Sequence, residues 1–317
     1  MNMPETAETG AEPILSVVLI VRHPEETPDA VLTALASETA SKMSGQAADG
    51  TAVETILVDG RPVSPDPRGP RPDRLTRLPR PGFNMPRLKA EGAAAARGRF
   101  VAFLEPKGVP VPGWLRATLA ACATHTGAVF GGAVIAGPGG AADRAAYAFE
   151  YSAFSLAALA RDNSRDLPGN NMVLPLAPLR DLCSDILEAE GLNKPFCQAR
   201  LTDGGLTIVM VPEMAVRIAT DYRLGALLAS RFRYARCFGG TRAALADRRQ
   251  RWLYRLGAPL VPVLLLHRHL GAALRAAGSG RPGTGTLAAL SALCLAWSAG
   301  EAAGSWAGPG RACDALY

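Results

Sequence analysis

The chain has 317 residues, and 48% of them are hydrophobic, which is enough for a packed core and excludes an intrinsically disordered chain. The net charge of +6 is unevenly distributed, because residues 217–281 contain thirteen Arg and only two acidic residues, a local balance of +11. Residues 1–13 are polar and acidic, without the basic start and apolar run of a signal peptide, and predict a disordered tail.

The first third of the chain alternates between strand and helix patterns. Residues 14–21 form a continuous, β-branched apolar run, which is typical of a buried parallel strand. Residues 28–40 begin with Pro and carry one apolar face, so they predict a helix. A second strand is expected at 53–58, a Pro- and Arg-rich loop at 61–81, and a helix at 87–97.

Residues 100–104 predict a third buried strand, which ends at the polar turn Glu105-Pro106-Lys107-Gly108. A helix is expected to open at Trp114 and to run to residue 125. In open α/β sheets, ligands bind outside the carboxyl ends of the strands. We therefore expect the chemistry of this protein near Glu105 and Lys107.

The rest of the chain also has both strand and helix patterns, which favours an α/β fold. Residues 129–136 and 206–211 are apolar runs of strand length, whereas the Ala-rich residues 142–160 and residues 181–191 predict helices. The six cysteines include no C-x-x-C pair and stand mostly among apolar residues, so we expect reduced thiols in a cytosolic protein rather than disulfides.

The stretch FVAFLEPKGVPVPGWL, from Phe100 to Leu115, resembles the centre of the family-2 glycosyltransferases. The resemblance implies a GT-A fold, that is, an α/β fold with a mainly parallel sheet flanked by helices. It covers residues 14–240, which would be the glycosyltransferase-like domain. It extends more weakly to residues 241–317, which would be a helical, membrane-associated segment.

The resemblance also implies an activity. Members of this family transfer a sugar from a nucleotide sugar to an acceptor with inversion, which here would be a lipid-linked or cell-envelope acceptor. In the family, an acidic D-x-D triplet holds a divalent metal on the diphosphate. This chain has Glu105-Pro106-Lys107 at that place, so Mn²⁺ or Mg²⁺ would keep only Glu105 as a ligand, and Lys107 would supply a fixed charge instead.

Four other residues occupy donor-site positions of the family. Asp59, after the second strand, would contact the nucleotide, and Lys89 matches a basic position of the next helix. Asn170 and Asn171 match a motif beside the donor sugar, where an amide can both donate to and accept from hydroxyl groups. The alternatives are a turn aspartate, a solvated helix lysine and an Asn-containing turn.

The catalytic acid of the family is expected at Asn193-Lys194, where this chain has none. Glu190 and Asp203 are the candidates to replace it, and both could equally be surface acids. The missing acid keeps a second hypothesis open, namely a catalytically silent, glycosyltransferase-like protein that binds a membrane or a partner.

Arg231, Arg233 and Arg236 resemble a basic stretch that follows the catalytic core in relatives and would bind phosphate, or would lie on a solvated or lipid-facing helix. Apolar stretches at 256–266 and 282–300 lie in or after this basic segment and predict an interfacial helical pair, with a buried hairpin as the alternative. These features favour an anionic membrane surface over nucleic acid, at the cytoplasmic face of a bacterial inner membrane.

Overall fold

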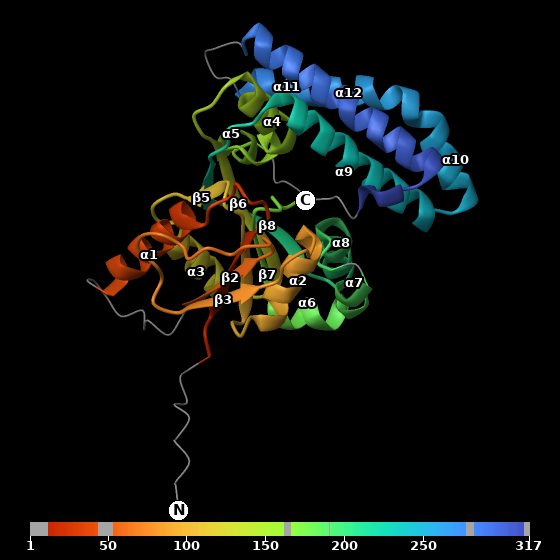
Figure 1. The fold of residues 1–317 in the computed structure, drawn as a ribbon. Helices are drawn as coiled ribbons and strands as arrows, with labels where there is room; N and C mark the ends of the chain where they lie inside the picture. Colours follow the sequence, from red (N-terminus) through yellow and green to blue (C-terminus); the bar gives the residue numbers. More distant parts are fainter. Residues whose placement is uncertain (1–11, 44–52, 162–165, 190, 277–281, 314–317) are drawn as a thin grey trace, which may run out of the picture.

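The computed structural model describes residues 12–43, 53–161, 166–189, 191–276 and 282–313. They form an α/β domain built on one mixed sheet, with a further layer of helices above it (Figure 1). The strands are β1 Leu15–Val21, β2 Val53–Asp59, β3 Leu75–Pro79, β4 Phe100–Leu104, β5 Gly108–Pro110, β6 Ala128–Ala136, β7 Asn171–Pro175 and β8 Thr207–Ile218.

The strand order is β3-β2-β1-β4-β7-β6-β8-β5. Neighbours are parallel from β3 to β4 and between β6 and β8, whereas β7 is antiparallel to both of its neighbours and β5 is antiparallel to β8. The sheet is therefore mixed with a parallel majority. The strands predicted at 14–21, 53–58, 100–104 and 129–136 are β1, β2, β4 and β6, and every residue of β1 and β4 is buried.

The helices are α1 Asp29–Met43, α2 Met85–Ala95, α3 Trp114–Thr124, α4 Ala141–Glu150, α5 Leu156–Leu159, α6 Leu176–Leu182, α7 Ser184–Ala189, α8 Lys194–Asp203, α9 Leu224–Leu245, α10 Arg248–Gly257, α11 Val261–Ala276 and α12 Thr284–Ala307. Short 3₁₀ turns, η1 Ser152–Phe154, η2 Ala258–Leu260 and η3 Gly310–Ala312, complete the chain.

Alternate residues of the central strands point to opposite faces of the sheet, as the two-residue period of a strand requires. On one face, Val17 and Leu19 of β1 pack with α1 and α3. On the other, Val18 and Ile20 pack with α2, α6 and α8. Both faces of the sheet are therefore covered, which explains why the central strands read as unbroken apolar runs.

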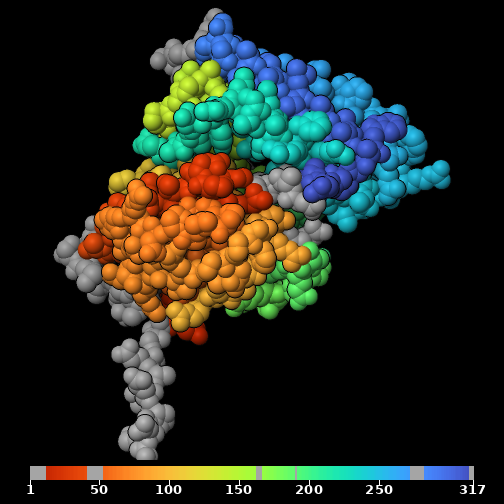
Figure 2. Space-filling model, viewed as in Figure 1, coloured from red at the N-terminus to blue at the C-terminus, as the bar shows by residue number. Residues whose placement is uncertain are grey.

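The layer above the sheet consists of α4, α9, α10, α11 and α12 (Figure 1). In the space-filling view, its teal and blue helices lie over the red and orange N-terminal half (Figure 2). Gly300 and Gly304 of α12 meet backbone carbonyls of α9, since a Cβ atom added at either glycine would lie 2.2 Å from an α9 oxygen. The two helices thus cross at a distance that side chains at these positions would prevent.

Several boundaries differ from the prediction. The loop expected at 61–81 contains β3, whose five residues pair with β2 at the edge of the sheet. None of the five is fully buried, so they lack the apolar run that predicts a strand. The helix expected at 142–160 ends at Glu150, and Ser155 caps the short α5. The helix expected at 181–191 is interrupted at Cys183, the C-cap of α6.

The strand expected at 206–211 continues through Pro212 as far as Ile218. The parallel pairing of β6 with β8 shifts register between Gly132 and Val134, opposite this proline. A proline cannot donate to the ladder, so an irregularity at this point lets the strand continue.

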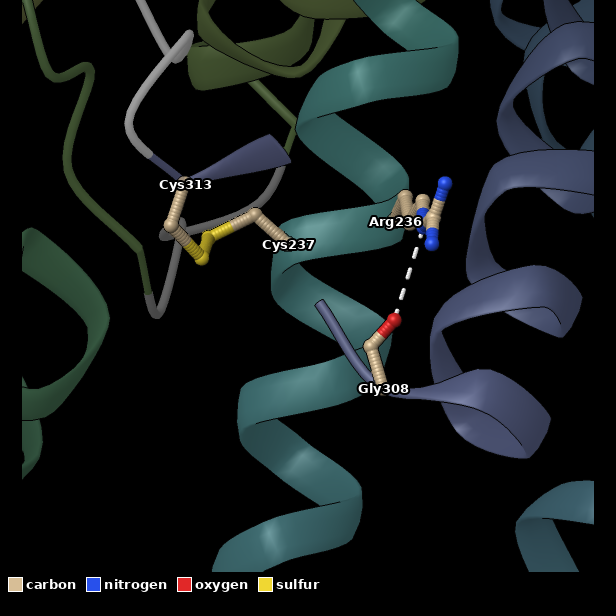
Figure 3. The surroundings of a disulfide bond; sticks show 4 residues. All are labelled: Arg236, Cys237, Gly308 and Cys313. Atoms are coloured by element: carbon tan, nitrogen blue, oxygen red, sulfur yellow. Dashed lines mark hydrogen bonds between the residues drawn. A yellow bond between two sulfur atoms is a disulfide. The ribbon is translucent and has the colours of Figure 1, made fainter. Parts of the chain in front are cut away.

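The prediction that all six cysteines are reduced is wrong for one pair. Cys237 of α9 forms a disulfide with Cys313, which follows η3 (Figure 3). In the same region Arg236 Nε donates to the Gly308 carbonyl at 3.4 Å. Spacing could not reveal the pair, because 76 residues separate the two cysteines and only the packing of α12 on α9 brings them together. The other four cysteines are free and buried.

Candidate functional site

The candidate site lies at the carboxyl edge of the central strands. Glu105 directly follows β4, and Asn171 at the start of the antiparallel β7 pairs with Leu104, so Asn170 is level with Glu105. Lys89 reaches the same place from α2. The turn that the sequence singled out is therefore joined by two other predicted site residues, as the rule for ligand sites in α/β sheets requires.

Glu105 is held between two ammonium groups. Its Oε1 lies 3.2 Å from Lys89 Nζ, and its Oε2 lies 3.1 Å from Lys107 Nζ. Burial alone would raise the pKa of the Glu105 carboxyl, but the charges of Lys107 and Lys89 lower it to about 2. The group is therefore ionised throughout the physiological range.

The two lysines differ in their surroundings. Burial lowers the pKa of Lys89, against the opposing effect of Glu105, and its Nζ also donates to the Gly169 carbonyl at 2.8 Å. For Lys107 burial acts to lower the pKa, but the combined attraction of Glu105, Tyr151, Tyr222 and Glu150 outweighs it and raises the pKa well above its usual value. The Lys107 side chain is 24% exposed against 8% for Lys89, so Lys107 is the cation that an incoming anion meets.

A third ammonium group stands beside these two. Lys194, at the start of α8, pairs with Asp166 and donates to the Leu167 carbonyl at 2.8 Å. A Cβ atom on Gly169 would lie 3.8 Å from Lys194 Cδ and 3.9 Å from Lys89 Nζ, so Gly169 lies between the two lysines. The resemblance to family-2 glycosyltransferases predicted an acid at Asn193-Lys194. The structure has the ammonium group of Lys194 there instead, which adds a cation to the site.

The two neighbouring asparagines have opposite environments. The Asn171 amide is fully engaged, since it accepts from Trp114 Nε1 at 2.9 Å and donates to the carbonyls of Ala133 at 3.1 Å and Met214 at 2.6 Å. Asn170 is 2% exposed, yet neither its Oδ1 nor its Nδ2 has a hydrogen-bond partner. An unpaired buried amide is costly, so Asn170 is the residue that calls for a ligand or a water molecule.

Asp59 ends β2 at the same edge and is almost fully buried. It accepts hydrogen bonds from Arg61 Nε at 2.9 Å and Arg61 Nη2 at 2.7 Å, and from the Ser64 hydroxyl. Burial would raise its pKa, but these hydrogen bonds lower it. Asp59 is thus ionised and paired, and Arg61, which the sequence analysis did not single out, fixes its orientation.

A divalent metal does not fit these residues. Among the residues that the structure describes, no group of three His, Cys, Asp or Glu side chains is placed to hold a metal ion. Both oxygens of Glu105 already face ammonium groups, and hard cations require several oxygen ligands. The lysines bring positive charge to the place where the metal of the resembling family would lie.

The structure describes one of the two predicted catalytic acids. Glu190 lies outside the described residues. Asp203 is exposed at the end of α8, just before β8 begins at Thr207 opposite Ala128, the first residue of β6. Since β6 and β4 run in the same direction, Asp203 lies toward the opposite edge of the sheet from Glu105. This position argues against Asp203 as the base.

The three arginines of α9 do not form one phosphate cluster. Arg231 pairs with Glu150 at 2.6 Å, Arg236 turns toward Gly308, and Arg233 is exposed. Residues two and five positions further along a helix point in different directions, which explains the separation. Arg231 nevertheless lies near the site, because its partner Glu150 directly precedes Tyr151, whose ring centroid lies 5.9 Å from Lys107 Nζ.

The sequence analysis missed a polar wall beside Lys107. Lys107 Nζ lies 5.9 Å from the centroid of the Tyr151 ring, and burial raises the pKa values of Tyr151 and Tyr222 above their usual range. Glu150 and Tyr151 end α4, so their chemistry was hidden in an Ala-rich helix that reads as packing. No local signal identifies them, because they reach this place only through the contacts of α4 with Val134 of β6 and with Tyr222 after β8.

Comparison with known proteins assigns the chain to no family. No family model matches the chain, and no curated protein matches it either. A solved mannosyltransferase from Pyrobaculum calidifontis, in complex with GDP-Man and Mn²⁺, is 15% identical, covering 93% of this chain and 74% of that one with a TM-score of 0.42. Residues 1–349 of TarS from S. aureus are 13% identical, covering 91% and 90% with a TM-score of 0.44. At these identities and scores neither likeness assigns an activity.

Proposed function

We propose that the protein is a glycosyltransferase that binds a nucleotide diphospho-sugar at the carboxyl edge of its sheet. One observation carries the proposal: Lys89 and Lys107 flank a buried carboxylate at a strand end, with Lys194 on the far side of Gly169 and the unpartnered amide of Asn170 beside them. A diphosphate is an anion that such ammonium groups attract, and a sugar hydroxyl can both donate to and accept from a free amide.

In this proposal Lys107 performs the task that a metal performs in the resembling family. Glu105 holds the Lys107 ammonium in place, so the charge is positioned before the donor arrives. A fixed cation close to the bond between the sugar and the diphosphate stabilises the leaving group as negative charge develops on it. The site is then independent of divalent metal, which agrees with the lack of suitable ligands.

Transfer also needs a base that removes the proton of the acceptor hydroxyl. Glu190 remains the candidate from the sequence, and Glu150 is the carboxylate that the described structure adds. The acceptor is proposed to be lipid-linked or part of the cell envelope. The proposed location is the cytoplasmic face of a bacterial inner membrane, and the Cys237–Cys313 disulfide is the observation against it, since disulfides are rare in the cytosol.

A second candidate function is a catalytically silent protein that binds a nucleotide or nucleotide sugar. The observation in its favour is that three acids that the structure describes at this edge are paired: Glu105 with two lysines, Glu150 with Arg231 and Asp59 with Arg61. A carboxylate held by a cation is a weaker base than a free one, because its proton affinity is reduced.

The test is calorimetric titration of the full chain with a panel of nucleotide sugars, in EDTA and in Mn²⁺. We expect binding that EDTA leaves unchanged and that Lys107→Ala weakens about tenfold to a hundredfold, the usual range for a charged hydrogen bond. Arg116→Ala, which removes an exposed charge from α3, is the matched control and should bind as the wild type does.

Each outcome has a defined reading. Binding that is lost in EDTA and returns with Mn²⁺ would contradict the lysine site. The absence of binding to every donor would contradict both candidate functions. Tight binding without transfer or donor hydrolysis, in the presence of an acceptor mixture, would favour the silent protein over the enzyme.

A further inference from the structure

The helical segment from α10 to α11 carries its largest apolar side chains on the outside. Six positions that are 46–70% exposed follow one another along this segment: Trp252, Leu253, Leu256, Leu260, Val263 and Leu264. Gly257, Ala258 and Val261 keep right-handed helical angles, so the spacing of one, three or four residues places the six on one stripe. We call these six residues the outer face.

A groove of about 530 Å³ extends the outer face toward α12. Its walls are mainly apolar and include Leu256 and Pro259 on one side and Leu295 and Trp306 on the other. Leu295 is 59% exposed and Trp306 is 54% exposed. A continuous apolar surface of this kind is unusual on a soluble monomer and indicates an interaction site.

Positive charge borders the outer face at both ends. Arg248 and Arg249 are exposed one turn before Trp252, and His267 and Arg268 are exposed one turn after Leu264. Residues 248–276 contain six Arg and no Asp or Glu. A partner that binds this surface should therefore be apolar opposite the outer face and negatively charged opposite the basic residues at its two ends.

Two tryptophans and an arginine form the border between the groove and the charged end. The Arg255 guanidinium lies 5.5 Å from the Trp252 ring centroid and 5.2 Å from that of Trp306, and its Nε donates to the Ser305 carbonyl at 3.0 Å. The two rings meet edge to face at 6.1 Å. Tryptophan with one apolar and one wet side is typical of the zone between lipid chains and headgroups.

The helix beside this face is not free to leave the protein. Among the described residues, α12 is the one helix long and apolar enough to cross a membrane, but 44% of that window is buried inside the protein. Its Glu301 is buried and accepts hydrogen bonds from Arg242 and from Trp297 Nε1. Its Gly300 and Gly304 are in backbone contact with α9. A surface contact with a membrane is therefore compatible with this packing, whereas insertion of α12 would break it.

A second copy of the chain fits the surface less well. In a two-fold symmetric dimer the same patch faces itself, so the arginines of both copies would be brought together without an acid on residues 248–276 to pair with them. Lipid headgroups with negative charge satisfy both the apolar stripe and its basic ends.

We propose that the outer face docks on the surface of an anionic lipid bilayer, with the six apolar side chains among the acyl chains and the bordering arginines at the phosphates. The α10–α11 segment would lie along the membrane plane, as an interfacial amphipathic helix does. The proposal does not depend on sugar transfer, because it concerns a surface that contains none of the lysines of the candidate site.

The experiment measures flotation of the full chain with vesicles of phosphatidylcholine alone and of phosphatidylcholine with phosphatidylglycerol, without donor or acceptor. We expect binding to the anionic vesicles, and quenching of tryptophan emission when the acyl chains are brominated. Leu256→Glu/Leu260→Glu should weaken this binding more than about tenfold, because two apolar side chains no longer enter the lipid. Val63→Glu, at a loop residue that is 77% exposed in the sheet domain, is the control and should bind normally.

The arginine contribution has its own pair of variants. Arg248→Gln/Arg249→Gln should reduce affinity for the anionic vesicles by about 30-fold, since each arginine near an anionic leaflet contributes about fivefold. Arg68→Gln/Arg116→Gln removes two exposed charges from the sheet domain and should have little effect. Equal binding to neutral and anionic vesicles, or no binding to either, would overturn the proposal. It would also be overturned by a stable dimer in sedimentation that Leu256→Glu/Leu260→Glu dissociates while wild-type protein ignores vesicles.

Discussion

In the sheet domain the apolar side chains lie inside and the buried charges at the carboxyl edge are paired, whereas the outer face exposes six large apolar side chains between arginines. Both regions depart from the ordinary pattern of a soluble protein. The departure in the sheet is a polar site enclosed by a core, suited to a small anionic ligand. The departure on α10 and α11 is an apolar surface open to solvent, suited to an extended partner.

The contrast between Asn171 and Asn170 gives the largest expected effect. Asn171→Ala should lower the free energy of unfolding by about 4 kcal/mol, because it leaves the Trp114 indole and two buried carbonyls without their partner. Asn170→Ala should cost less than about 1 kcal/mol, because no protein hydrogen bond is lost. Denaturant titration of both variants measures the difference. Equal losses would mean that Asn170 also has a structural role.

The ion triad at Glu105 is expected to give the next effect. Glu105→Gln should cost about 3 kcal/mol at pH 7, because two lysine ammonium groups lose their buried partner. Glu91→Gln, which removes a half-exposed partner of Arg80, is the matched control and should cost less than about 1 kcal/mol.

The same triad predicts a pH dependence. The pKa of Glu105 falls from its usual 4.5 to about 2 on folding, so its contribution is complete above about pH 4.5 and is lost as the pH falls toward 2. The gap between wild type and Glu105→Gln should therefore narrow in that interval. A gap that is constant from pH 7 to pH 2.5 would show that the carboxylate charge is not what stabilises the fold.

Two glycine variants test whether α9 and α12 cross as closely as the structure shows. Gly304→Ala should lower the free energy of unfolding by about 2 kcal/mol, because its Cβ would lie 2.2 Å from the Arg236 carbonyl and the two helices must move apart. Gly285→Ala in the same helix meets its nearest atom at 3.4 Å and should be neutral or slightly stabilising. Similar behaviour of the two variants would argue against the close crossing.

The outer face should contribute almost nothing to folding. Leu260→Ala, at a side chain that is 63% exposed, should change the free energy of unfolding by less than about 0.5 kcal/mol in detergent-free buffer. Leu290→Ala, at a fully buried position on α12, should cost about 2–5 kcal/mol. A large loss for Leu260→Ala would mean that the outer face is buried in solution, against a second copy or another segment.

Much of the fold was predictable because its central strands are buried on both sides. A strand covered by helices on each face carries a mainly apolar run, so β1, β2, β4 and β6 were visible in the sequence, although β2 also contains Glu54 and Thr55. β3 was not, because an edge strand of five partly buried residues has neither a long apolar run nor clear alternation. The extension of β8 past Pro212 was hidden for a related reason, since proline normally ends a strand and only the register shift on β6 permits it.

The candidate site divides in the same way. The sequence by itself determined that Glu105 and Lys107 stand at a strand end, because a polar turn after a buried strand is a local feature. The family resemblance, and no local feature, placed Lys89 and Asn170 in the same site. Neither local features nor the resemblance could determine that Lys194 lies beside them, that Asn171 serves the core, or that Glu150 lies near Lys107. These relations join segments 16 to more than 100 residues apart, and only the order of strands in the sheet brings them together.

The basic C-terminal third shows most clearly what the sequence alone cannot predict. Composition determined that arginines and apolar residues occur together, but burial decided which of the apolar residues hold the helices to one another and which face outward. Leu290 of α12 and Leu260 of η2 are the same residue in two helical segments of this third, yet one is fully buried and the other is 63% exposed. The side that a helix buries depends on its neighbours, and those neighbours, like the partner of Cys237, are fixed by the tertiary structure alone.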